Sequence, residues 1–100
     1  MKLPSIPSYE HRKNEIVQKY PALIDAINKL ENKIIEYPTN GIKEVILFEN
    51  RHVVTRKQGM RTNLFSDRLP DHYLYLTINY GMIITGDVAL LTIYLHDYVI

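Results

Sequence analysis

Residues 73–98 limit the possible folds more than any other stretch, because nearly all of them favour extended backbone. The segment reads YLYLTINYGMIITGDVALLTIYLHDY. β-branched, aromatic and leucine residues fill it, and Gly81 and the pair Gly86-Asp87 interrupt it. This pattern predicts two or three adjacent strands of one antiparallel sheet.

Alternation along these strands predicts which side chains share a face. In the last strand, one face is expected to carry Thr92, Tyr94, His96 and Tyr98, and the other face is expected to carry Leu91, Ile93 and Leu95. The preceding strand likewise separates Tyr73, Tyr75 and Thr77 from Leu74, Leu76 and Ile78. The leucine-rich face is expected to meet helices, and the tyrosine-rich face is expected to point outward, available to a ligand.

Two helices are expected before the strands. Ser8 is the expected N-cap of the first, which runs to about Lys19, and residues 2–6 form a short edge strand before it. Pro21 opens a second helix that ends near Glu36, where Pro38 and Gly41 follow. The second helix has a broad apolar face made of Leu23, Ile24, Ile27, Leu30, Ile34 and Ile35.

The middle of the chain predicts a hairpin followed by an irregular stretch. Residues 43–48 and 51–56 read as strands joined by a turn at Glu49-Asn50, and residues 57–70 read as irregular. Helices that precede a run of hairpin-connected strands indicate an α+β fold in two layers. We expect one domain over residues 1–100, with the two helices packed on a four- to five-stranded antiparallel sheet.

Composition excludes several kinds of chemistry. The chain has no cysteine, which rules out disulfides, thiolate nucleophiles and cysteine-ligated metals. Its four histidines lie at no close repeat, so no metal site is expected. No Gly-rich phosphate loop is present, and the N-terminal residues lack the apolar run of a signal peptide. No apolar run reaches the ~20 residues of a membrane span, so we expect a cytoplasmic protein without a membrane partner.

Charge is concentrated in the centre of the chain. The net charge is only +1, but residues 50–72 hold five basic side chains against two acidic ones. The bases are Arg51, Arg56, Lys57, Arg61 and Arg68. Such a segment indicates either a localised surface for anions or a solvated loop with a chance excess of bases.

Four segments carry a resemblance to a known family. They are residues 9–13 (YEHRK), 19–23 (KYPAL), 36–41 (EYPTNG) and 91–98 (LTIYLHDY), and the order of elements agrees with them. Together they resemble the RelE/ParE superfamily of toxins from type II toxin–antitoxin systems. The resemblance implies a curved sheet, an antitoxin protein as partner, and cofactor-free endoribonuclease activity on mRNA at the ribosome. The ParE branch poisons DNA gyrase instead.

The residues offer the groups that metal-free RNA cleavage needs. The ribose 2′-OH attacks the adjacent phosphate, which requires a base, an acid for the leaving oxygen and cations on the phosphoryl oxygens. His96 and Tyr98 match the family's C-terminal pair, while Arg61 and Arg68 match its central arginines loosely. These four are the expected catalytic residues. The expected phosphate- and RNA-binding residues are Arg51, Arg56, Lys57, His52 and His72.

One departure from the family leaves the function open. Leu74 stands where many members carry an arginine, and loss of such a charge-stabilising group costs on the order of 10²-fold in rate. A non-catalytic interaction protein of the same fold is therefore the alternative: a gyrase poison, an inactivated toxin homologue or a small viral or plasmid binding domain. A scaffold that associates through its exposed sheet edge is a third possibility. The sequence alone does not indicate whether the protein is a monomer or an oligomer.

Overall fold

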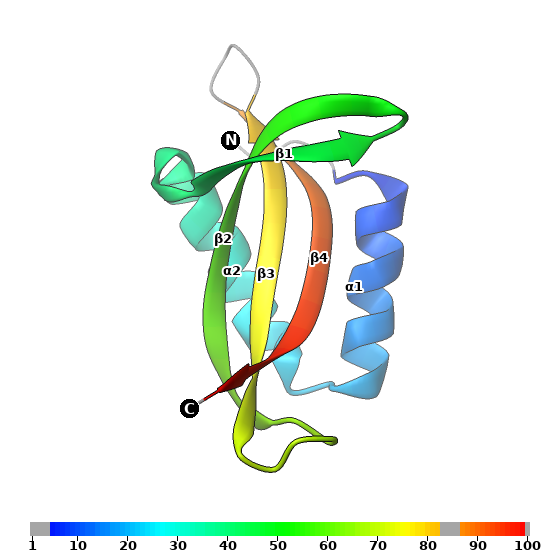
Figure 1. Cartoon of the computed structure of the whole chain (residues 1–100), viewed down its shortest axis with the longest axis vertical. Coiled ribbons are helices and arrows are strands. Elements are labelled where there is room, and N and C mark those ends of the chain that lie inside the picture. The colour runs from blue at the N-terminus through cyan, green and yellow to red at the C-terminus, as the bar shows by residue number, and fades with distance from the viewer. Residues whose placement is uncertain (1–4, 83–86, 100) are drawn as a thin grey trace.

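The computed structural model describes residues 5–82 and 87–99, and it has the expected α+β fold (Figure 1). Two helices precede four strands, and all four strands form one antiparallel sheet in the order β1-β2-β3-β4. The elements are α1 (Pro7–Lys19), α2 (Leu23–Glu36), the 3₁₀ turn η1 (Pro38–Asn40), β1 (Ile42–Phe48), β2 (Arg51–Phe65), β3 (His72–Met82) and β4 (Val88–Val99).

The helices begin at different residues from those expected. Helix α1 starts at Pro7 after the N-cap Ile6, so Ser8 is not the cap. A proline suits this first helical position because its missing N–H has no partner there anyway. Helix α2 starts at Leu23, after a turn in which Leu23 N–H donates to the carbonyl of Tyr20. The expected edge strand at residues 2–6 lies mostly outside the described residues, and Ser5 and Ile6 are not in a strand.

Strand β2 is much longer than expected. The prediction that residues 57–70 are irregular is wrong as far as Phe65, because this stretch pairs with β3 from Arg56–Tyr80 to Phe65–Tyr73. A register shift between Arg61 and Phe65 accommodates extra residues on β2 and keeps the pairing. Cross-strand pairing therefore outweighs the polar composition of the segment, and only residues 66–71 form a connecting loop.

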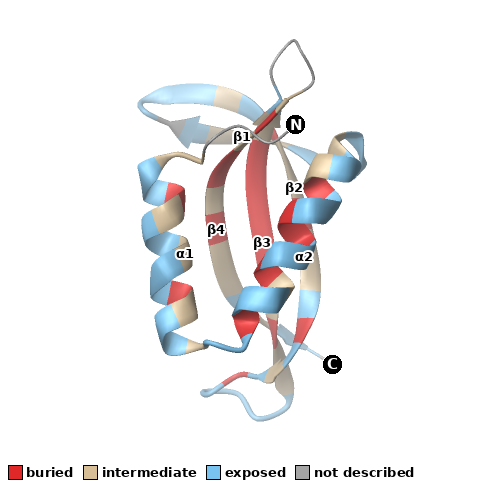
Figure 2. Ribbon diagram, turned by 180° about the vertical axis from the view of Figure 1, so that it is seen from behind, coloured by how far each residue is buried: buried red, intermediate tan, exposed pale blue. Residues whose placement is uncertain are grey.

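Both helices cover the same face of the sheet (Figures 1 and 2). Helix α1 packs mainly on β4 and α2 mainly on β2, and the core lies between helices and sheet. Its fully buried members include Tyr9, Ile27, Leu30, Ile34, Leu76, Ile78, Tyr80 and Leu90. The predicted inward and outward faces of β3 are thus confirmed. In β4 the register shifts opposite Asn79 and Tyr80, so that Val88, Leu90 and Ile93 supply its core positions.

Polar side chains tie the helical layer together and to the sheet. The hydroxyl of Tyr9 donates to the buried carboxylate of Glu31 at 2.7 Å, and Lys13 Nζ donates to the same carboxylate oxygen at 3.1 Å. The hydroxyl of Tyr80 donates to the Pro38 carbonyl at 2.6 Å and accepts from Gln58 Nε2 at 3.1 Å. These contacts fix α1 to α2 and fix the end of the helical layer to β2 and β3.

Candidate functional site

The sheet face opposite the helices carries a group of aromatic side chains around one arginine. We call it the open-face cluster, and it consists of Arg61, Phe65, Tyr73, Tyr75, Tyr94, His96 and Tyr98. The strand register places these residues in rows across β2, β3 and β4. One row is Arg61, Tyr75 and His96, and the next is Phe65, Tyr73 and Tyr98. Neither helix lies in front of the sheet in Figure 1, so the face of the sheet that the helices leave open is turned toward the viewer there.

The rings of this cluster touch one another. Tyr75 lies at the centre, with ring centroids 5.1 Å from those of both His96 and Tyr98. Phe65 stacks on Tyr73 with centroids 4.6 Å apart, and the guanidinium of Arg61 lies 4.7 Å from the Tyr73 ring centre. These mutual contacts restrain rings that remain open to solvent, since Phe65 is 53% exposed and Tyr98 46% exposed. The result is a pre-arranged aromatic surface with a cation beside it.

His96 is the exposed imidazole of this surface. It lies on the edge strand β4, and its Nε2 is 3.4 Å from the Thr77 hydroxyl oxygen. Arg61 and His96 flank Tyr75 on neighbouring strands, which separates their backbones by roughly 10 Å at ordinary strand spacing. A nucleotide or phosphodiester lying over Tyr75 would therefore reach both side chains.

The structure brings three of the four expected catalytic residues to this face: Arg61, His96 and Tyr98. Phe65 was missed because its segment was expected to be irregular. Had β2 been predicted to continue, its alternation with Arg61 would have placed Phe65 on the same face.

The basic residues of the hairpin lie elsewhere. Arg51 and His52 are exposed near the β1–β2 turn. Arg56 donates to the Thr39 carbonyl at 3.3 Å and to the Gly41 carbonyl at 2.9 Å, so its guanidinium supports η1. Lys57 Nζ lies 3.4 Å from a carboxylate oxygen of Glu44. Of these four, Arg51 and Lys57 alternate onto the face of β2 that also carries Arg61, and both lie outside the two rows of the cluster.

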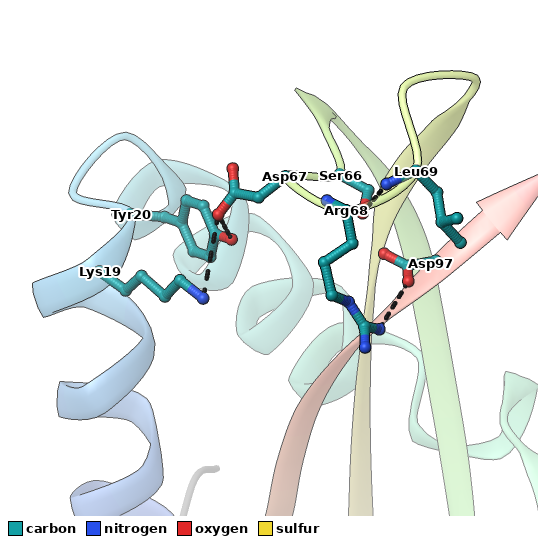
Figure 3. Close-up of polar contacts among 7 residues, drawn as sticks. All are labelled: Lys19, Tyr20, Ser66, Asp67, Arg68, Leu69 and Asp97. Atoms are coloured by element: carbon teal, nitrogen blue, oxygen red, sulfur yellow. Dashed lines mark hydrogen bonds and ion pairs between the residues drawn. The ribbon is translucent and has the colours of Figure 1, made fainter.

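Arg68 is held on the helix-facing side of the sheet (Figure 3). Its Nη2 donates to the Asp97 carboxylate at 2.8 Å. The adjacent Asp67 turns to α1, where its carboxylate accepts from the Tyr20 hydroxyl at 2.7 Å and lies 3.9 Å from Lys19 Nζ. Two neighbouring loop residues therefore fasten the loop at residues 66–71 to two different elements, β4 and α1.

These contacts shift two pKa values. The pKa of Asp97 is lowered, because the Ser66 hydroxyl and then the Arg68 guanidinium donate to its carboxylate, although partial burial opposes the shift. The pKa of Tyr20 is raised, because its hydroxyl donates to Asp67. The lowered pKa shows that the ionised Asp97 carboxylate is the form that these loop contacts favour.

A cavity of about 380 Å³ opens between α1, this loop and β4. Ile16, Leu74 and Leu95 form apolar parts of its wall, and Arg68 and Asp97 belong to its lining. Leu74 is only 5% exposed, so an arginine at this position would point into the helix-facing layer and away from the open-face cluster. His72 also lies on this side, and its buried Nδ1 has no hydrogen-bond partner among the described residues.

Other features of the described residues bear on chemistry. Within residues 5–82 and 87–99, no three histidine, aspartate or glutamate side chains gather where they would hold a metal ion. No helix in the same residues is long and apolar enough to cross a membrane.

Comparisons with protein-family models, with curated proteins and with solved structures gave no match to this chain. The functional argument therefore depends on the open-face cluster itself.

Proposed function

We propose that the protein binds single-stranded RNA on the open face of its sheet. The observation that carries the proposal is the contact set of Tyr75 with His96 and Tyr98, beside Arg61 on the next strand. Exposed aromatic rings on a sheet stack on unpaired bases, and an arginine holds the backbone phosphate. Helices cover only the other face, so a strand of RNA has free access to these rings.

The same cluster holds the groups for metal-free cleavage, which we propose as its reaction. An imidazole accepts and donates protons near neutral pH, so His96 would take the proton of the ribose 2′-OH. Arg61 would stabilise charge on the phosphoryl oxygens, and Tyr98 would donate a proton to the leaving 5′-oxygen. The products would be a 2′,3′-cyclic phosphate and a free 5′-hydroxyl.

The biological setting that we propose is a type II toxin–antitoxin pair in the cytoplasm. Support comes from the resemblance to RelE/ParE toxins and from the order of two helices followed by an antiparallel sheet. The RNA would be mRNA on the ribosome, and the protein partner would be an antitoxin. Expression of the chain should then arrest growth, and a small antitoxin gene should lie beside its own.

A non-catalytic RNA-binding protein is the second candidate, and the position of Arg68 favours it. The Arg68 guanidinium pairs with Asp97 on the helix-facing side, so Arg61 alone of the two expected catalytic arginines faces the cluster. Binding by stacking needs only the rings and a cation, whereas cleavage gains rate from each added charge-stabilising group.

Fluorescence anisotropy with a short labelled oligouridine tests binding. Tyr75→Ala and Arg61→Ala should each weaken affinity, Tyr75→Ala by ~5- to 100-fold if it stacks on one base. Tyr37→Ala and Arg12→Ala serve as matched controls, because Arg12 lies on helix α1 and Tyr37 directly follows helix α2, and both side chains are exposed on the helical layer away from the cluster. Equal affinity in all four variants would reject the open face as the binding surface.

Product analysis tests cleavage separately. Wild type should cut the RNA in the presence of EDTA and spare the 2′-deoxy substrate, and His96→Ala should slow cleavage by ~10²-fold or more while RNA still binds. Tight binding without any cleavage by wild type would establish the second candidate.

A further inference from the structure

The β1–β2 hairpin has one face that nothing in the described residues covers. We call it the hairpin face, and its six side chains are Lys43, Val45, Leu47, His52, Val54 and Arg56, which pair directly across the two strands. Its apolar members are unusually open: Val45 is 60% exposed, Leu47 66% and Val54 68%. Val45 and Val54 are direct cross-strand partners, and Leu47 is the next residue of β1 on the same face, so the three side chains form a patch rather than scattered exposure.

The patch is open because the helical layer ends before it. Helix α2 ends at Glu36 and η1 ends at Asn40, and the hydrogen bonds of Arg56 to the Thr39 and Gly41 carbonyls mark the end of the covered part. Beyond them the hairpin extends past both helices and is mostly exposed, as Figure 2 shows at its upper left. A shallow hollow beside Val54 also includes Met82.

The opposite face of the hairpin is turned toward the molecule. Glu44 accepts a hydrogen bond from Asn79 Nδ2 at 3.1 Å and forms the ion pair with Lys57, and Thr55 is 2% exposed. The hairpin is therefore held in one orientation by its inner face, which leaves the hairpin face directed outward.

Strand β1 is also an edge of the sheet. The register places Phe48 opposite Arg51 across the two-residue turn, and hydrogen-bonded pairs alternate along an antiparallel ladder. The backbone N–H groups of Lys43, Val45 and Leu47 should consequently point away from β2. Edge strands usually carry charged side chains, prolines or bulges that prevent pairing with another strand, and the charged side chain that β1 has on this face is Lys43.

The charges on the hairpin face indicate which kind of partner fits it. The hairpin face has Lys43, His52 and Arg56 around its apolar centre and no acidic side chain. We propose that β1 accepts an extended segment of a partner protein, whose side chains over this face are apolar and acidic. The segment would add a fifth strand to the sheet. A second copy of this chain fits poorly, because pairing β1 with itself would bring two sets of these bases together. This proposal is independent of RNA binding.

A synthetic peptide tests it. The probe is acetyl-Thr-Ile-Thr-Val-Thr-Glu-Thr-amide, which in an antiparallel pairing sets Ile against Leu47, Val against Val45 and Glu against Lys43. Titration followed by amide NMR shifts should perturb β1 and the hairpin first. N-methylation of the peptide amides that face β1 should weaken binding at least tenfold, because it removes backbone hydrogen bonds.

Charge reversal and a matched apolar control complete the test. Lys43→Glu should weaken binding of the Glu peptide, and a peptide with Lys in place of Glu should restore it. Val45→Asp should abolish binding, whereas Val99→Asp, at a site 67% exposed on β4, should not. The proposal fails if the N-methylated peptide binds as well as the parent peptide, or if the amide shifts centre on the open-face cluster. It also fails if sedimentation shows that the chain dimerises and Val45→Asp abolishes the dimer. Binding of anionic vesicles to the hairpin without binding of the peptide would reject it as well.

Discussion

The ring of Tyr75 lies directly against Gly59 on the neighbouring strand, where a Cβ on Gly59 would come within 2.4 Å of Tyr75 Cε1. That Cβ would also lie 3.0 Å from the backbone carbonyl oxygen of Leu76. The absence of a side chain at Gly59 is therefore what allows the central ring of the open-face cluster to lie where it meets His96 and Tyr98.

Gly59→Ala should displace Tyr75 and weaken RNA binding about as much as Tyr75→Ala does. Overpacking of this kind costs about 1–3 kcal/mol of unfolding free energy, measurable by urea denaturation. Gly81→Ala is the matched control, because the nearest atom to a Cβ there is Leu91 Cδ1 at 3.8 Å. If Gly59→Ala binds RNA normally, the position of the Tyr75 ring does not matter for binding.

Tyr80→Phe should destabilise the fold without altering the open face. The variant loses the hydroxyl that donates to the Pro38 carbonyl and accepts from Gln58, so the partly buried Pro38 carbonyl and the Gln58 amide each lose a partner. The expected cost is about 1–3 kcal/mol in urea denaturation, with an unchanged dependence on urea. Tyr37→Phe, at a side chain 51% exposed, should leave stability unchanged. Equal stability of the two variants would show that the Tyr80 contacts contribute nothing net.

Alkaline pH should destabilise the protein through Tyr9. Burial and then the hydrogen bond to Glu31 raise the pKa of Tyr9 above its ordinary value of 10.0. The unfolded chain therefore releases this proton first, so stability is constant below about pH 10 and falls above it. Urea denaturation at increasing pH should show the fall, and Tyr9→Phe should reduce it. The difference in ultraviolet absorbance between wild type and Tyr9→Phe reports the ionisation of Tyr9. If Tyr9 ionises over the same pH range as the exposed tyrosines, the prediction is wrong.

Acid should release the loop at residues 66–71 before the core unfolds. Because the folded-state pKa of Asp97 is lowered, its contribution to stability is present above the ordinary aspartate pKa and is lost as pH falls through the folded value. Amide exchange in the loop should rise over that range. Asp97→Asn should show fast exchange at all pH values, and Asp71→Asn, an exposed loop control, should behave as wild type. Slow loop exchange in Asp97→Asn would mean that the contacts of Asp97 do not hold the loop.

Local pattern predicted most of the architecture. The apolar period of residues 23–36 and the alternation of residues 73–78 each depend on near neighbours. The structure confirms the faces that they predicted, except that Ile24 of the second helix is 37% exposed. The turn at Glu49-Asn50 is also confirmed, since both residues adopt positive φ, 50° and 62°. Alternation likewise predicted that His96 and Tyr98 share a face.

What failed depends on distant partners. Residues 57–65 look irregular because Gly59 and Asn63 disfavour strands, yet β3 lies beside them and supplies the ladder. Arg68 was assigned to the site from its charge and from a loose match to the central arginines of the RelE/ParE superfamily. Only the fold reveals that Asp97, twenty-nine positions later, holds it on the other side. Composition counts charges but does not say which of them are already paired.

Strand β2 connects two surfaces that face opposite ways. Val54 and Arg56 belong to the hairpin face, while Lys57 and Arg61 point to the open side of the sheet. Because side chains alternate, inserting one residue between Val54 and Gly59 would invert the hairpin relative to the aromatic rings and turn its apolar patch inward. Relatives of this chain should therefore differ in β2 length by two residues or not at all, so that the length of one strand fixes the relative orientation of its two surfaces.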